Sequence, residues 1–159
     1  MSSTDASANT STDAPDVGTI DMKLEVVTLP VSDIDRAVSF YQSLGWRLDA
    51  DLTAGDDFRV VQFTPPHSQC SIHFGTGLTA SAPGSADRMI LAVTDIEAAR
   101  DDLVGRGVDV SEIYEARPPG FESIEGRSYF AYASFKDPDG NGWLLQEIQT
   151  RLPGREWED

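Results

Sequence analysis

Cysteine, lysine and histidine are scarce in this chain of 159 residues, and each scarcity excludes a class of protein. Cys70 is the only cysteine, so no internal disulfide can form and a secreted disulfide scaffold is excluded. Only two lysines and ten arginines oppose 27 acidic residues, which leaves a net charge of -15. Because nucleic acids and anionic membranes are bound through lysine and arginine, we expect neither as a partner. No apolar run approaches the roughly 20 residues of a membrane-spanning helix.

The rest of the composition is that of an ordinary globular domain. Hydrophobic residues make up 40% and charged residues 25% of the chain, and its length suits one domain with its own core. The first residues show no basic segment followed by an apolar one, so we expect a cytoplasmic protein. The acidity fits either adaptation to high salt or an acidic tail on a mildly acidic protein, and composition does not separate the two.

A duplication is the clearest internal feature. The segment Val31–Gly45 recurs 62 positions later as Val93–Gly107, and five positions are identical: Val31 and Val93, Asp33 and Asp95, Ile34 and Ile96, Ala37 and Ala99, Gly45 and Gly107. Each copy follows a β-branched apolar run and leads into further strand-like runs, so one supersecondary unit is written twice. Two such units that share a core tend to build their site between them.

This repeat divides the chain. Residues 1–21 lack any periodicity, and we expect them to form a disordered acidic tail. The folded domain is expected over residues 22–150, with a first module at 22–80 and a second at 86–150. Residues 151–159 are expected to form a C-terminal tail.

Each module is expected to contain a strand, a helix and three further strands. Ser32 and Thr94 are the expected N-caps of the two helices. Segment 115–126 is longer than a hairpin needs, which is typical of a lid or a binding loop. The expected strands are Leu24–Leu29, Trp46–Leu52, Phe58–Phe63 and Cys70–Phe74 in the first module, and Met89–Val93, Val108–Tyr114, Ser128–Phe135 and Trp143–Ile148 in the second.

Three motifs carry a resemblance to a known family: Val31–Tyr41 (VSDIDRAVSFY), Leu44-Gly45-Trp46, and the hairpin Phe135–Asn141 (FKDPDGN). Over residues 22–150 the chain resembles the vicinal oxygen chelate superfamily, which includes glyoxalase I, bleomycin and fosfomycin resistance proteins and extradiol dioxygenases. The resemblance implies an α+β fold in which two βαβββ modules form a curved, partly open mixed sheet or barrel. It also implies a divalent metal that acts as a Lewis acid on the concave face, and a homodimer.

The chain departs from the family at the positions that usually hold the metal. Those positions fall at Val26, Leu144 and Arg88, of which the first two cannot bind a metal and the third would repel it. The fourth falls at Ile72 or His73, and strand alternation favours His73 on the concave face. One histidine does not make a metal site, so we expect no metal cofactor, although the resemblance still implies a divalent ion.

His73 is the candidate for acid–base catalysis because histidine titrates near neutral pH. It can equally be a hydrogen-bonded, half-buried residue without a catalytic part. His67 lies in a proline-rich turn and is expected in solvent. Glu25 and Glu147 are expected on the helix-facing side, near strand ends where a carboxylate can reach solvent.

Polar and aromatic side chains on the predicted strands outline a ligand pocket. Arg88 could hold a carboxylate or phosphate of a ligand, or form an ion pair at the start of its strand. Phe121 could close over the pocket or remain a surface aromatic. The predicted pocket comprises Thr28, Gln62, His73, Arg88, Phe121, Phe130, Tyr132 and Gln146.

The sequence therefore predicts a protein that binds a small organic molecule in a concave sheet pocket without the usual metal. The alternatives are a metal-dependent lyase, isomerase or dioxygenase of the same superfamily, and a metal-free enzyme that uses His73 with Arg88 as an anion holder.

Overall fold

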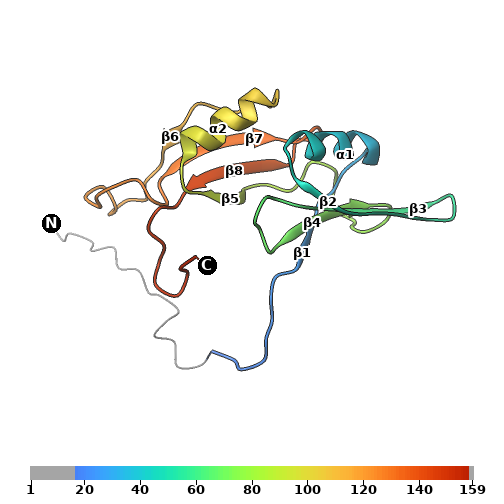
Figure 1. Cartoon of the computed structure of the whole chain (residues 1–159), viewed down its shortest axis with the longest axis horizontal. Helices are drawn as coiled ribbons and strands as arrows, with labels where there is room; N and C mark the ends of the chain where they lie inside the picture. The colour runs from blue at the N-terminus through green and yellow to red at the C-terminus, as the bar shows by residue number, and fades with distance from the viewer. Residues whose placement is uncertain (1–16, 158–159) are drawn as a thin grey trace.

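The computed structural model describes residues 17–157 as two modules that lie side by side (Figure 1). Most of the tail predicted at residues 1–21, and residues 158–159 of the C-terminal tail, lie outside the described residues. The elements of the first module are β1 Val26–Thr28, α1 Ile34–Ser43, β2 Arg47–Ala54, β3 Phe58–Thr64 and β4 Ser71–Gly75. Those of the second are β5 Met89–Val93, α2 Ile96–Gly105, β6 Tyr114–Glu115, β7 Ala131–Lys136 and β8 Gly142–Glu147.

Each module folds its strands into one open, mixed sheet. The strand orders are β1-β4-β3-β2 and β5-β8-β7-β6, so the two sheets repeat one topology. In each sheet the first strand pairs in parallel with the last one, and the remaining pairs are antiparallel. The α+β fold with two βαβββ modules is confirmed, as open sheets rather than a closed barrel. Within residues 17–157, neither helix has the length and apolarity to cross a bilayer.

Tyr41 of α1 is the centre of the core that joins the modules. Its ring is fully buried and lies 5.3 Å from the Trp46 ring and 6.2 Å from the Trp143 ring of β8. Its hydroxyl donates a 2.8 Å hydrogen bond to the buried carboxylate of Asp137 in the second module. Burial, and then the Asp137 charge, raise the pKa of Tyr41 far above its usual range, so the hydroxyl stays protonated.

The helix caps lie one residue later than predicted. Asp33 and Asp95 are the N-caps, and their carboxylates accept hydrogen bonds from the amides of Arg36 and Ala98 at 3.1 and 3.0 Å. Ser32 and Thr94 were therefore the wrong choices. The Ser32 hydroxyl donates instead to Asp139, a residue of the other module that no local pattern could bring to it.

The strand predicted at Val108–Tyr114 is also wrong over most of its length, because only Tyr114 and Glu115 are in regular register with β7, and the one further backbone bond to β7 within the predicted strand is from the Ser111 amide to the Ser134 carbonyl. Nearer its start, the Arg100 side chain donates to the carbonyl groups of Ser111 and Val110 at 2.7 and 3.4 Å. These hydrogen bonds occupy backbone acceptors that a continuous strand would offer to a neighbouring strand.

Glu147 faces the helix side as predicted, but it does not reach solvent. Only 1% of this residue is exposed, and its carboxylate accepts a 3.1 Å hydrogen bond from the Ile96 amide at the start of α2. Arg127 lies 2.7 Å from the same carboxylate and also binds Glu97. This pairing compensates the charge that burial would otherwise penalise. Glu25, in contrast, is exposed.

Candidate functional site

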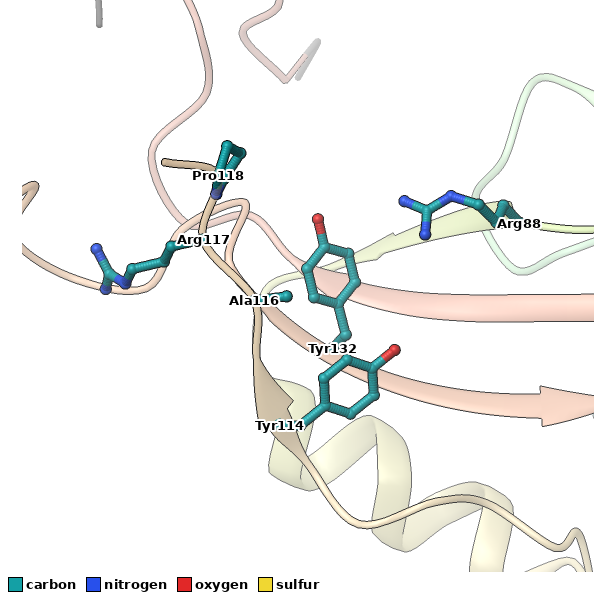
Figure 2. Close-up of a pocket in the computed structure, with 6 residues that line it drawn as sticks. All are labelled: Arg88, Tyr114, Ala116, Arg117, Pro118 and Tyr132. Atoms are coloured by element: carbon teal, nitrogen blue, oxygen red, sulfur yellow. The ribbon is translucent and has the colours of Figure 1, made fainter. Parts of the chain in front are cut away.

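A cavity lies at one end of the second sheet (Figure 2). It has a volume of about 260 Å³. Its walls come from three places: the residue before β5, facing side chains of β6 and β7, and the loop that follows β6. The lining residues are Arg88, Tyr114, Ala116, Arg117, Pro118 and Tyr132.

Tyr114 and Tyr132 form an aromatic platform in this cavity. They are directly opposite each other in the β6–β7 register, and their rings lie 5.8 Å apart with only 24° between their planes. Tyr114 stays 42% exposed, so the platform is open to a molecule from outside. A flat aromatic compound can add to such a stack, gaining dispersion and burying apolar surface.

Arg88 supplies a positive charge beside the platform. Its backbone is in the left-handed region with φ at 56°, and its amide donates to the Asp87 carboxylate at 2.9 Å. Across residues 17–157, its guanidinium forms no ion pair or hydrogen bond. Figure 2 shows this side chain across the cavity from Pro118. An unpaired guanidinium at a cavity suits a carboxylate or another oxygen acceptor.

The loop wall is held in shape by Arg117. This side chain donates to the carbonyl groups of Ile124 and Gly126 at 2.7 and 2.5 Å, and its guanidinium lies 4.5 Å from the centre of the Phe130 ring. Figure 2 shows the guanidinium directed away from the cavity, so Arg117 lines it with other atoms. Phe121 packs on Phe130 with ring centres 6.1 Å apart. These two phenylalanines therefore support the loop and do not line the cavity.

The first sheet carries a separate polar row on its concave face. His73 lies between Thr28 and Gln62 in the register, and its Nε2 is 2.6 Å from the Thr28 hydroxyl oxygen. Beside this row the Thr64 hydroxyl lies 2.6 Å from Ser71 and bonds to Asp49. Hydrogen bonds from Arg47, then from Thr64, hold the pKa of Asp49 below its usual range. None of these residues lines the aromatic cavity.

Comparison with known proteins agrees with this architecture. The sequence profile of the Glyoxalase/Bleomycin resistance protein/Dioxygenase superfamily matches residues 23–145. The chain belongs to this superfamily. Among curated proteins, none matches it.

Several solved structures resemble the chain over most of its length. TnmS3, an antibiotic binding protein from Streptomyces sp. CB03234, is 29% identical with a TM-score of 0.64, over 82% of this chain and 99% of its own. A superfamily member from Sphaerobacter thermophilus is 26% identical with a TM-score of 0.62, over 80% and 98%. The fosfomycin resistance protein FosX from Listeria monocytogenes, solved with Mn(II), is 16% identical with a TM-score of 0.56, over 86% and 98%, and shares the fold.

The residues at the superfamily's metal positions do not fit a metal ion. Val26 and Leu144 carry no donor atom, Arg88 carries a positive charge, and His73 is hydrogen-bonded to Thr28. Among the described residues, no group of three or more histidine, cysteine, aspartate or glutamate side chains is placed to hold a metal. We therefore derive no chemical step through a metal in this superfamily member.

The structure divides the predicted pocket among three places. Arg88 and Tyr132 line the cavity, and the Nε2 of Gln146 lies 2.9 Å from the hydroxyl oxygen of Tyr132. Thr28, Gln62 and His73 lie together on the first sheet, and Phe121 and Phe130 support the loop. His67 is exposed in its turn.

Sequence reasoning missed Tyr114 and the structural part of Arg117. Tyr114 stood at the end of a predicted strand, and only the register with β7 reveals that it stacks on Tyr132. Arg117 is the one cation in segment 115–126, which was a usable signal because a guanidinium can bind several carbonyl groups of its own loop.

Proposed function

We propose that this superfamily member binds and holds a planar aromatic molecule with an anionic or strongly accepting oxygen. The observation that carries the proposal is the platform of Tyr114 and Tyr132 beside the unpaired guanidinium of Arg88. The platform suits the flat face of the molecule, and Arg88 suits its oxygen. The antibiotic binding protein TnmS3, at 29% identity, supports a binding role without chemistry.

The net charge of the chain does not oppose an anionic ligand at this place. No aspartate or glutamate lines the cavity. At physiological ionic strength charges are screened over roughly 8 Å, so carboxylates beyond that distance act weakly on a bound anion, and the nearer Asp87 carboxylate accepts a hydrogen bond from the Arg88 amide. The overall charge of -15 then acts mainly on distant polyanions.

We also propose that the protein forms a homodimer through apolar residues that are exposed in the single chain. In the β2–β3 hairpin, Leu52 is 60% and Phe58 41% exposed, and Ile90 on the second sheet is 49% exposed. Apolar surface of this kind favours association. Light scattering should give twice the chain mass of 17.3 kDa, and Leu52→Glu with Phe58→Glu should give the single mass. A single mass for the unmodified protein would refute the homodimer.

The binding proposal is tested with three small molecules of similar size. 2-Naphthoate is planar and anionic, 2-naphthalenemethanol is planar and neutral, and decahydro-2-naphthoate is anionic but not planar. Isothermal titration should rank 2-naphthoate first, by about three- to tenfold over the saturated acid, since only the planar ring can stack.

Tyr114→Leu should remove most of the preference for the planar acid over the saturated one, because leucine offers no flat face. The matched control is Trp157→Leu, since Trp157 is an exposed aromatic residue that does not line the cavity. If the three molecules bind equally well, or if none binds, the proposed site is wrong.

A further inference from the structure

Gln146 makes two hydrogen bonds with one nitrogen atom. It lies on β8 opposite Tyr132 of β7, and the residue is only 9% exposed. Its Nε2 lies 2.9 Å from the backbone oxygen of Tyr129 and 2.9 Å from the hydroxyl oxygen of Tyr132. The amide therefore ties a backbone carbonyl and a cavity side chain together.

The partner on the backbone fixes which way the amide points. A carbonyl oxygen only accepts hydrogen bonds, so the nitrogen of Gln146, and not its oxygen, must face Tyr129. An amide nitrogen has two hydrogens, and both are then used, one on Tyr129 and one on Tyr132. The Tyr132 hydroxyl oxygen is consequently the acceptor in its bond with Gln146.

The proton of the Tyr132 hydroxyl is left for a ligand. Across residues 17–157 this hydroxyl donates to no acceptor. Figure 2 shows the hydroxyl pointing into the space between Pro118 and Arg88. Two hydrogen-bond donors, the phenol and the guanidinium, thus face one end of the aromatic platform.

We infer that Gln146 is a positioning residue that sets the ligand class by holding Tyr132 as a donor. The site then selects aromatic molecules with two accepting oxygens on one edge, such as an aryl carboxylate or a ring carbonyl beside a phenolate. A molecule that places a donor at this edge meets two donors and leaves hydrogen bonds unmade, which costs affinity. This inference rests on the proposed function.

Near-isosteric pairs of probes measure this selectivity directly. 2-Acetylnaphthalene carries an accepting oxygen where 2-isopropenylnaphthalene has a CH2 group, and indole carries a donating N–H where indene has a CH2 group. The unmodified protein should prefer the ketone by about three- to tenfold and should show no preference for indole. A ratio of affinities within one pair is insensitive to a general loss of fold or packing.

Two variants separate positioning from packing. Tyr132→Phe keeps the ring and removes one of the two donors, so the preference for the ketone should fall to what Arg88 alone provides. Gln146→Glu replaces the donor by a carboxylate that accepts from Tyr132, so the ketone preference should fall and binding of indole relative to indene should improve. Gln42→Glu on the exposed side of α1 is the matched control and should leave both ratios unchanged.

The outcomes distinguish the inference from the proposal beneath it. If the unmodified protein binds neither 2-naphthoate nor the ketone, the proposed function fails, and the inference with it. If it binds them but Gln146→Glu or Tyr132→Phe leaves the ketone preference as large as in the unmodified protein, the proposed function stands and the role of Gln146 is refuted. Should Gln146→Glu not fold, judged by circular dichroism, Tyr132→Phe and Gln146→Met decide, since both must lower the ratio.

Discussion

The two modules repeat one order of elements, but matched positions on their concave faces carry opposite chemistry. With the repeat spacing of 62, Thr28 corresponds to Ile90 and Val26 to Arg88. Thr28 pairs in the sheet with His73, and Ile90 pairs in the same way with Leu144. The first module therefore has the polar pair Thr28 and His73 where the second has the apolar pair Ile90 and Leu144. The second module has the charged Arg88 where the first has the apolar Val26.

The starts of the two helices, in contrast, are alike. Asp33 and Asp95 cap them with the same hydrogen bond, and the apolar residues that follow, Ile34 with Ala37 and Ile96 with Ala99, are identical. Core positions are constrained by packing density, while a concave face tolerates any side chain that water or a ligand can satisfy. The comparison teaches that the duplicated scaffold supplies shape, and that the face of each sheet supplies chemistry independently.

The largest effect on stability is expected from removing the carboxylate of Asp137, which links the two modules. Asp137 is buried and accepts hydrogen bonds from Tyr41, from the Asp139 amide and from two nitrogen atoms of Asn141. Asp137→Ala leaves these donors unpaired and should lower the free energy of unfolding by about 3 kcal/mol or more. Urea unfolding followed by tryptophan fluorescence measures it. Asp57→Ala, at an exposed position, should change it by less than about 0.5 kcal/mol.

The next effect concerns the charge that distinguishes Arg88 from Val26. Arg88→Ala should weaken binding of 2-naphthoate by about 1.5–3 kcal/mol, the scale of a hydrogen bond to a charged group. Alanine at this left-handed position adds no strain that arginine lacks. Titration calorimetry gives the difference, and Arg155→Ala, an exposed arginine in the C-terminal segment, is the control. Equal affinities for the two variants would remove Arg88 from the site.

A third change makes the first module resemble the second. Thr28→Ile alone removes a hydroxyl that pairs with His73, and should cost about 1 kcal/mol of unfolding free energy. Thr28→Ile combined with His73→Leu copies the apolar pair of the second module and should nearly restore the free energy of unfolding. Chemical unfolding of the four proteins in the cycle yields the coupling energy. A coupling energy of zero would show that the hydrogen bond adds nothing to stability.

The smallest effect is a pH dependence confined to the first module. Hydrogen bonds from Arg59, at 2.9 and 2.8 Å, hold the pKa of Asp51 below its ordinary value of 3.8. The pKa of Asp51 is lower in the folded protein than in the unfolded chain. The pair therefore stabilises the protein fully at pH values above the unfolded pKa, and this stabilisation is lost as the pH falls through the folded pKa. Between pH 5 and roughly pH 2.5 the melting temperature of the Asp51→Asn variant should therefore fall by less than that of the unmodified protein. Parallel curves would show that the pair does not contribute.

The fold could be predicted because its determinants are local and repeated. The helix motifs, the apolar alternation and the hairpin sequence each lie within about ten residues, and the duplication repeats the helix motif and the order of strands. The caps were misplaced because each helix start offers two adjacent capping residues, Ser32 with Asp33 and Thr94 with Asp95, and in both cases the aspartate is the cap. At α1 the Ser32 hydroxyl binds Asp139, 107 positions away, which no local pattern reveals.

The site could be predicted only in part, since it depends on register across strands. Alternation put Arg88, Tyr132 and Gln146 on one concave face. It could not show that Tyr114 stacks on Tyr132, because most of the strand predicted at Val108–Tyr114 is not paired. Nor could it show the burial of Glu147, which depends on Arg127, twenty residues earlier in the chain.

The way Arg117 holds its loop has a consequence for how this protein can change. Its guanidinium grips backbone oxygens, and every amino acid offers the same oxygen at that point of the chain. Substitutions at Ala116 and Pro118, which line the cavity, can therefore alter its wall while the Arg117 hydrogen bonds keep the loop in shape. Relatives that keep this arginine and the length of the loop can therefore acquire different ligand preferences while the fold keeps its stability.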